Sequence, residues 1–362
     1  MLIGITLADR GLSNAAVGVV LASLLAGSAA VSVAIARYGD RVGRRRFYWL
    51  LFVAMAVSGT VFALTSWLPA LIVAGLTGTV STDVVESGPF TSLEQAMLPG
   101  VAGPKGPARI FATYNTVATL AGSLGALAAG GLALANLQSS YWLLAYPLAS
   151  ALALPAALRL SPAVEPEDRD ATRASLDRSK QDVRRLSALF ALDSFGGGFV
   201  PQTFVAYLLA RRFGASTETI SLLFVAIGGL QAISFQLAGR IAGRIGLVRT
   251  MVFTHLPSNV LLAAVGFAPN LWSAIVLLLG RHLLSQMDVP ARQALVVTIV
   301  VPEERTAAAA YTNTARYVTR PVAPLVAGAF LRAGLGIPFV LSGVLKSVYD
   351  LTFFALYRKR GL

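Results

Sequence analysis

Long apolar runs separated by short polar segments extend along almost the whole chain. Many are about 20 residues long, the length that a helix needs to cross a hydrocarbon core of about 30 Å. Because backbone groups in lipid must be satisfied within their own segment, each run is predicted to be a helix. The pattern predicts eleven spans, at 15–36, 47–66, 68–88, 109–135, 140–158, 187–209, 218–240, 248–268, 270–290, 306–332 and 336–357.

One long hydrophilic stretch interrupts this pattern. It reads "LSPAVEPEDRDATRASLDRSKQDVRR" and covers residues 160–185, with prolines first and a charge-rich segment after them. Such a composition is typical of a polar linker. We therefore expect a helical bundle at 1–158, a cytoplasmic linker at 159–186 and a second helical bundle at 187–362.

The composition agrees with a lipid environment. Hydrophobic residues make up 56% of the chain, charged residues 13%, and the mean hydropathy is +0.68. The net charge of +13 is spread over short loops between apolar runs, so we expect a lipid bilayer and no nucleic acid as the partner. Without any cysteine, the chain has no disulfide or thiolate metal site. His255 and His282 lie on separate spans, so neither a metal site nor a cofactor is predicted.

The basic residues are distributed unequally between the two sides of the predicted spans. Most of the 30 lysines and arginines fall on one side, and the few on the other side are Arg10, Arg211, Arg212 and Arg332. Cytoplasmic loops of membrane proteins are enriched in Lys and Arg. We therefore expect the arginine-rich side and the C-terminus in the cytoplasm, with the chain in the cell membrane.

The chain also repeats itself. "ARYGDRVGRRR" at 36–46 matches "GRIAGRIGLVR" at 239–249 with an offset of 203, which aligns Gly43 with Gly246. A further match aligns Asn115 with Asn313. Two parallel halves related along the membrane normal are one layout of secondary transporters, with the substrate site between the halves.

The segment "GDRVGRRR" resembles the signature loop between the second and third helices of the major facilitator superfamily. Ala36 stands where the family has its first glycine, and Gly243 replaces the acid in the second half. The matching residues are Asp40, Arg41, Gly43, Arg44 and Arg45 in the first half and Arg244 and Gly246 in the second. The resemblance implies an all-α membrane protein of two six-helix pseudo-symmetric bundles that works by alternating access.

The repeat predicts that the first half lacks most of its first helix. Met1 aligns with Phe204, inside the first span of the second half, and only "MLIGITLA" precedes the next loop. Eight residues cannot cross a bilayer. Either the true start lies upstream or the chain is a truncated relative, and an inactive relative is one alternative function.

In the superfamily the signature loop holds the two bundles together on the cytoplasmic side. The resemblance implies such a latch for Asp40 with Arg41, Arg44 and Arg109. The alternative is that these arginines only set topology and bind anionic lipid. Glu94 and Arg292, near the cytoplasmic ends of their spans, are predicted to belong to the gate.

Charged residues deep in the predicted spans are candidates for a substrate or coupling site, because burying them in lipid costs at least about 2.5 kcal/mol each. Arg316 and Arg320 are four apart and share a helix face. In one interpretation Arg281, Arg316 and Arg320 attract an anionic or polar substrate, and Asp193 changes protonation. In the other, Arg281 with Asp193, and Lys346 with Asp350, are static pairs.

Asp83 and Glu86 are three residues apart on one predicted helix face. They are further candidates for the substrate or coupling site. A salt-bridge cluster at the cytoplasmic end of their span is the simpler interpretation.

The expected function is secondary active transport of a small molecule by a monomer. No Gly-rich phosphate loop with Lys and Ser/Thr is present, so ATP is not expected as the energy source. The resemblance favours protons as the coupling ion and export as the direction, with uptake of a small organic anion or sugar as the alternative. A membrane-embedded enzyme is not expected, because neither histidine has an acid at catalytic spacing.

Overall fold

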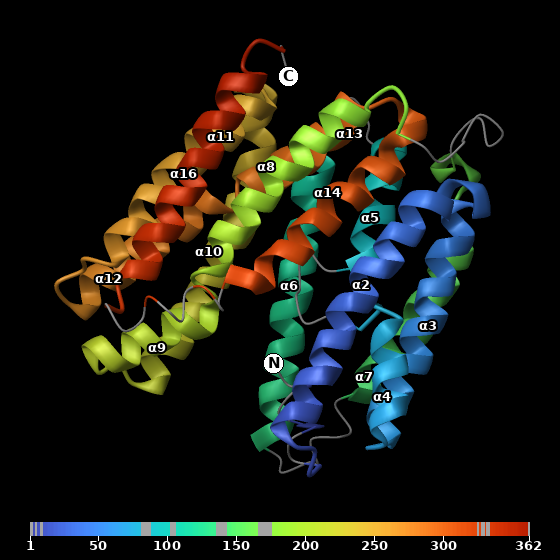
Figure 1. Ribbon diagram of the computed structural model, residues 1–362, viewed down its shortest axis with the longest axis horizontal. Helices are drawn as coiled ribbons and strands as arrows, with labels where there is room; N and C mark the ends of the chain where they lie inside the picture. The colour runs from blue at the N-terminus through green and yellow to red at the C-terminus, as the bar shows by residue number, and fades with distance from the viewer. Residues whose placement is uncertain are drawn as a thin grey trace. The chain divides into compact units, whose positions relative to one another are not determined.

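The protein is described by a computed structural model that covers residues 3, 6–7, 10–80, 88–101, 106–134, 143–165, 176–323, 326, 330 and 334–360. Every regular element in these residues is a helix, which confirms the predicted all-α fold (Figure 1). Two predicted site residues, Asp83 and Glu86, lie outside the described residues.

The helices follow one another along the chain with short connections. In order they are α2 (Asn14–Val42), α3 (Arg44–Leu64), α4 (Leu68–Leu76), α5 (Gly88–Met97), α6 (Pro107–Leu134), α7 (Ala145–Leu158), α8 (Lys180–Gly198), α9 (Gln202–Phe213), α10 (Thr217–Ile245), α11 (Leu247–Val265), α12 (Leu271–Ser285), α13 (Asp288–Ile299), α14 (Arg305–Thr319) and α16 (Ile337–Tyr357). Short 3₁₀ helices are η1 (Leu98–Val101), η3 (Pro162–Val164), η4 (Pro302–Glu304) and η5 (Arg320–Val322).

Among the described helices, four are long and apolar enough to cross a membrane without interruption. They contain 16–42, 44–64, 218–245 and 337–357. Three predicted spans are instead divided, because 68–88 contains parts of α4 and α5, 187–209 parts of α8 and α9, and 270–290 parts of α12 and α13. Broken helices of this kind are tolerated where neighbouring protein, rather than lipid, satisfies the backbone.

Proline explains two of these interruptions. α8 ends at Gly198, and Pro201 is the N-cap of α9, where its missing N–H costs nothing. In the second case Pro290, in the first turn of α13, has no N–H to donate to Gln286. The Gln286 carbonyl instead accepts from Val289 at 3.4 Å, a tighter turn that ends one helix and begins the next.

The internal repeat is visible in the local backbone. Gly43 and Gly246 each end a 29-residue helix, α2 or α10, with φ of +98° and +87°, values that strain any side chain with a Cβ. Each helix also begins with a serine cap, Ser13 or Ser216, whose hydroxyl accepts a backbone N–H. The same offset of 203 therefore relates both ends of the two helices.

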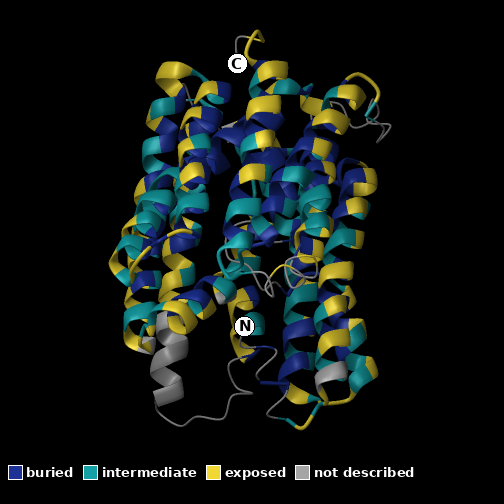
Figure 2. Cartoon of the chain, turned by 60° about the vertical axis from the view of Figure 1, so that its left-hand side comes forward, coloured by how far each residue is buried: buried dark blue, intermediate teal, exposed yellow. Residues whose placement is uncertain are grey.

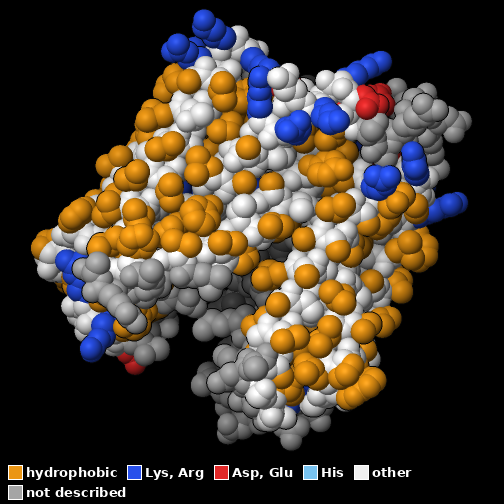
Figure 3. All heavy atoms as spheres, in the orientation of Figure 1, with side chains coloured by type: hydrophobic (Ala, Val, Ile, Leu, Met, Phe, Trp, Pro, Cys, Tyr) orange, Lys and Arg blue, Asp and Glu red, His pale blue; other side chains and the backbone are white. Residues whose placement is uncertain are grey.

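The apolar cores follow the same repeat. Two clusters of buried side chains, one for each half of the sequence, contain residues that the offset of 203 aligns. The aligned buried pairs are Val20 with Leu223, Leu24 with Ile227, Phe62 with Val265 and Leu71 with Ala274. Figure 2 shows the result as buried stripes on helices whose other positions are exposed, and Figure 3 shows apolar side chains over the visible helix surfaces, as lipid contact requires.

The chain divides into two compact units that do not follow the two sequence halves. Unit 1 contains residues 1–101, 124–180 and 300–314. Unit 2 contains residues 102–123, 181–299 and 315–362. Each unit therefore includes one helical segment from the other half of the sequence: the start of α14 belongs to unit 1, and the start of α6 belongs to unit 2.

Close packing of α11 against α16 organises unit 2 (Figure 1). It depends on Gly343, since a Cβ at this position would lie 2.6 Å from the Asn259 carbonyl oxygen and 2.9 Å from the Ala263 side chain. At the end of α16, Arg360 donates two hydrogen bonds of 2.8 and 2.9 Å to Asp182 in the first turn of α8. These hydrogen bonds raise the pKa of Arg360 above its ordinary value.

Candidate functional site

The signature loop forms a cluster in unit 1 around Asp40 and Arg44. Arg44 Nε donates to Asp40 Oδ1 at 2.7 Å, and both side chains are buried. Thr306, in the first turn of α14, donates to the same carboxylate oxygen at 2.8 Å. A residue of the second half thus binds directly to the signature loop of the first half.

Glu165 fixes the loop from the other side. Its carboxylate accepts the backbone N–H groups of Arg44 at 2.8 Å and Arg45 at 3.2 Å, the first two residues of α3. An anion at this position satisfies unpaired donors and interacts favourably with the helix dipole. We call Asp40, Arg44, Glu165 and Thr306 the loop cluster.

The other predicted gate residues lie in different surroundings. Arg41, Arg109 and Arg244 are exposed, and Arg44 is the predicted partner that forms an ion pair with Asp40 within unit 1. Glu94 accepts a 2.6 Å hydrogen bond from the Tyr48 hydroxyl. Arg292 belongs instead to a network in unit 2.

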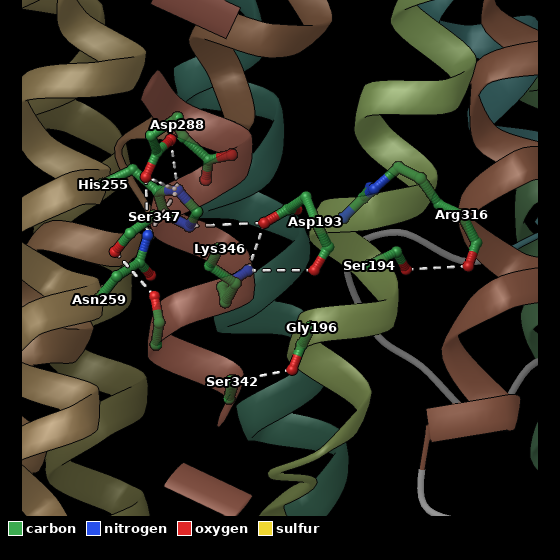
Figure 4. Close-up of polar contacts among 12 residues, drawn as sticks. Asp193, Ser194, Gly196, His255, Asn259, Asp288, Arg316, Ser342, Lys346 and Ser347 are labelled. Carbon is green, nitrogen blue, oxygen red and sulfur yellow. Dashed lines mark hydrogen bonds and ion pairs between the residues drawn. The ribbon is translucent and has the colours of Figure 1, made fainter. Parts of the chain in front are cut away.

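Seven polar side chains of unit 2 form this second group, which we call the charge network (Figure 4). It contains Asp193, His255, Asn259, Asp288, Arg292, Lys346 and Asp350, from α8, α11, α13 and α16. All seven are buried. Because burying ionisable groups in a membrane is costly, such a concentration marks a functional site by default.

Asp193 joins three helices. Its Oδ1 forms an ion pair with Lys346 Nζ, and its Oδ2 lies 3.7 Å from Arg292 NH1. Arg292 also pairs with Asp288 at 3.0 Å, one turn earlier on α13. Its guanidinium lies 5.7 Å from the ring centroid of Phe190, one turn before Asp193 on α8, within the range of a cation–π contact.

His255 connects the two carboxylates on either side of it. Its Nδ1 lies 2.9 and 3.0 Å from the two Asp350 oxygens, and its Nε2 lies 3.8 Å from Asp193 Oδ1. Asn259, one turn later on α11, donates to Asp350 at 2.7 Å. The described structure therefore corrects the static pairs proposed above: Asp193 pairs with Lys346 and Asp350 with His255.

Two arginines lie next to the network without being buried in it. Arg281 and Arg316 are half-buried, and each interacts electrostatically with Asp193. Figure 4 shows Arg316 extending from α14 toward α8. Arg281 NH1 contacts His282 Nε2 at 3.1 Å, while Arg320, before Pro321 at the end of α14, is exposed.

The sequence did not single out His255 and Asn259. A histidine and an asparagine one turn apart in the middle of an apolar span were a usable signal, because polar residues there face a partner or a cavity. Their partner Asp350 lies 95 positions from His255. No local pattern identifies a partner at such a separation.

Two amide pairs link the sequence halves, one within each unit. In unit 2, Asn115 on α6 donates to Gln293 on α13 at 2.7 Å. In unit 1, Asn313 on α14 donates to Gln95 on α5 at 3.3 Å. The repeat aligns these two asparagines, so both units contain the same kind of hydrogen bond between side-chain amides.

The fully buried pair Asn115–Gln293 is expected to contribute more stability than the longer pair. Replacing Asn115 by alanine should lower the free energy of unfolding by about 1–3 kcal/mol, because the Gln293 amide is left buried without its donor. A double-mutant cycle with Gln293→Leu, measured by denaturation in mixed micelles, should give a coupling energy above about 0.5 kcal/mol. The same cycle on Asn313 and Gln95 should give a smaller coupling energy. Equal coupling energies for the two pairs, or no coupling between Asn115 and Gln293, would contradict this ranking.

Comparison with family profiles shows the family of the chain. The profile of the Major Facilitator Superfamily matches residues 1–279. The chain belongs to this superfamily. It is also 26% identical over 384 residues to an uncharacterized membrane protein of Saccharomyces cerevisiae, covering 94% of this chain and 86% of the yeast protein.

Solved transporters have the same fold. The proton:xylose symporter XylE has a TM-score of 0.74 at 15% identity, covering 98% of this chain and 92% of XylE. The Escherichia coli fucose:proton symporter FucP has 0.73 at 13%, covering 99% and 95%. The human organic anion transporter MFSD10 has 0.70 at 18%, covering 97% and 88%.

These findings establish a multi-pass membrane transporter with the superfamily fold, acting on a small-molecule substrate. The protein is a transporter and not an enzyme, as the sequence predicted.

Proposed function

We propose that this protein is a secondary active transporter that moves a small organic anion together with a proton. The proposal places substrate recognition at Arg281 and Arg316 and proton coupling in the adjacent charge network. Arginine suits the first role because its planar fork matches a carboxylate. The network suits the second because it holds several ionisable groups out of water in one place.

The observation that carries this proposal is the convergence of four cationic side chains on Asp193. The described side chains around it include four cations, Arg281, Arg292, Arg316 and Lys346, but three carboxylates, Asp193, Asp288 and Asp350. Arg281 and Arg316 are the half-buried members. Arginine side chains gathered in one place suit the binding of an anionic substrate. The human neighbour of the same fold is itself an organic anion transporter.

The positive charges around Asp193 also predict how proton binding and anion binding affect each other. A proton taken up by the network adds one more positive charge beside the arginines and so strengthens the binding of an anion. By thermodynamic linkage, the anion then strengthens the binding of the proton by the same factor. Proton and substrate that favour each other are carried in the same direction, and two neighbours of the fold, XylE and FucP, are proton symporters.

Proton-coupled efflux, the direction favoured by the sequence resemblance, remains the second candidate. Exchange of a proton for the substrate requires the two to compete for the site. The cations around Asp193 give an anion no reason to compete with a proton. Efflux would therefore fit a cationic or neutral substrate better than an anion.

The proposal also includes the gate and the topology. The loop cluster would latch the first half to the start of α14 on one side of the membrane, since Asp40 binds both Arg44 and Thr306. The arginine-rich loops support a cytoplasmic location for this side and for the C-terminus. We place a monomer in the cell membrane.

A flux measurement in proteoliposomes distinguishes the candidates. The probes are radiolabelled p-aminohippurate, succinate and glucuronate, with xylose as the neutral control. We expect an inward proton gradient to raise p-aminohippurate uptake at least ten-fold. A potassium diffusion potential alone should change it less than two-fold, because a monoanion and a proton carry no net charge together. Xylose-only transport, absence of flux for all three anions, or anion uptake driven by an outward proton gradient would contradict the proposal.

A further inference from the structure

His255 and Asn259 are polar, but the residues that align with them in the first half of the sequence are not. The offset of 203 aligns His255 with Phe52 and Asn259 with Ala56. Phe52 packs in an aromatic cluster, with ring centroids 5.2 Å from Tyr48 and 4.9 Å from Phe90. The fold therefore fills this position with an apolar ring in one half. Packing alone does not require a histidine in the other.

The contacts of His255 fit an imidazole that gains and loses a proton. The neutral ring can donate from Nδ1 to Asp350 while Nε2 stays unprotonated. Nε2 lies 3.8 Å from Asp193 Oδ1, so a second proton on the ring would face a carboxylate there. Protonation places an imidazolium between two carboxylates, so that each ring N–H has a carboxylate to face. The change forms one N–H bond at Nε2 when the ring takes up a proton and breaks the same bond when the proton leaves.

Protonation would act directly on the link between α8 and α16. Lys346 Nζ and His255 Nε2 face the same oxygen of Asp193, Oδ1. A positive charge on His255 therefore competes with Lys346 for that oxygen and weakens the ion pair. Since Asp193 also interacts with Arg281 and Arg316, the change reaches the proposed substrate arginines.

Of the two histidines, His255 is the one that lies against carboxylates of the charge network. α10 carries charged residues only at its ends, and α12 contributes Arg281 and His282. His282 Nδ1 lies 2.8 Å from the Leu278 carbonyl oxygen, and its Nε2 contacts Arg281 NH1 at 3.1 Å. The groups facing the network from the remaining helices are Asp193 (α8), Asp288 and Arg292 (α13), Arg316 (α14), and Lys346, Tyr349 and Asp350 (α16).

We infer that His255, held by Asp350 and Asn259, is the proton carrier of this transporter, and that its protonation loosens the Asp193–Lys346 pair during the transport cycle. This inference rests on the proposed proton coupling and assigns it to one residue. It moves the coupling function from Asp193, which is already engaged with Lys346 and Arg292, to its neighbour on α11.

The test separates proton-driven accumulation from exchange. Proteoliposomes containing the parent, His255→Gln or His255→Phe are assayed with the best-carried anion of the panel. His255→Gln keeps hydrogen bonding without titration, and His255→Phe installs the residue of the first half. We expect both to lose at least ten-fold in accumulation under a proton gradient. Counterflow at equal pH on both sides, which needs no net proton movement, should stay within three-fold for His255→Gln.

The second histidine provides the matched control. His282→Gln should keep the parental ratio of accumulation to counterflow, because His282 makes no ion pair with a carboxylate in the described part of the chain. ¹⁵N NMR of the imidazoles, with only two histidines in the sequence, should show His255 changing protonation when the anion binds.

The outcomes separate this inference from the proposed function. If His255→Gln accumulates within two-fold of the parent, or if its imidazole signal ignores the anion, the carrier assignment is wrong while symport stands. If the parent itself shows no proton-driven accumulation, the proposed function is wrong. If counterflow and accumulation fall together in His255→Gln while the variant remains folded, His255 serves binding rather than coupling, and the inference is overturned.

Discussion

Replacing Asp193 by leucine is expected to lower the free energy of unfolding by about 3–5 kcal/mol, because it leaves Lys346 as an unpaired buried charge. The two side chains are 4% and 8% exposed, so water cannot take the place of the lost partner. The double variant Asp193→Leu/Lys346→Met removes both charges and should recover most or all of this stability. Denaturation in mixed micelles measures both values.

The double variant Asp193→Leu/Lys346→Met should regain stability without regaining transport. If the ion pair only held α8 to α16, the double variant would be stable and active. We expect it to be stable but to transport at least ten-fold more slowly than the parent, since Asp193 also interacts with Arg281 and Arg316. The exposed pair Asp182–Arg360 is the control, because Asp182→Asn should cost less than about 1 kcal/mol. Normal transport by the double variant would reduce Asp193 to a structural residue.

The second large effect is expected at Asp40. Asp40→Asn removes the charge that neutralises buried Arg44 and weakens the bond from Thr306 on α14. Breaking a buried ion pair costs about 3–5 kcal/mol. This cost destabilises the conformation in which Asp40 and Arg44 are buried together. We therefore expect the conformation that holds the signature loop against α14 to lose at least ten-fold in population.

A chain without cysteines makes this measurable. A single cysteine at Ala307, which is 6% exposed and adjacent to Thr306, should react with a membrane-impermeant maleimide from the arginine-rich side at least ten-fold faster when Asp40→Asn is also present. The control is Arg46→Gln, at an exposed position of the same loop, which should leave the labelling rate unchanged. An unaltered rate in Asp40→Asn would show that the cluster is not a latch.

Much of the fold could be predicted from the sequence, because the bilayer imposes strong rules on length and composition. The repeat was visible as an offset in the sequence, and Gly43 with Gly246 shows it again in the backbone. The divided helices were harder to predict. Whether a proline such as Pro290 ends a helix depends on which neighbouring groups satisfy the freed carbonyls, and these are tertiary contacts.

The candidate site was predictable only in outline. Asp193 was recognised as a buried acid and paired with Arg281 in one interpretation, but the cation that binds it, Lys346, lies 153 positions away in the sequence. The i, i+4 spacing of Lys346 and Asp350 placed them on one face, and short-range spacing then suggested that they bind each other. Instead, Lys346 pairs with Asp193 on α8 and Asp350 pairs with His255 on α11. The helices packed around that face provide a separate partner for each of them.

The loop cluster shows the opposite case. Asp40 and Arg44 are also four residues apart, and in this cluster the local pair does form, at 2.7 Å. Both lie near the end of α2, where the chain turns at Gly43 and Arg44 begins α3. The first half thus places its charged pair at a helix junction, whereas the second half, with Gly243 in place of the acid, has its buried charges deeper in α8, α11, α13 and α16.

Substrate-driven proton movement tests the central claim most directly. Proteoliposomes containing the parent protein and an entrapped pH-sensitive dye, in weakly buffered medium without any imposed pH gradient, receive an inward gradient of p-aminohippurate. The account predicts that the lumen becomes more acidic as the anion enters, with about one proton per anion, and that His255→Gln abolishes the signal while anion exchange persists. Anion entry without acidification, or acidification that is equal in His255→Gln, would contradict it.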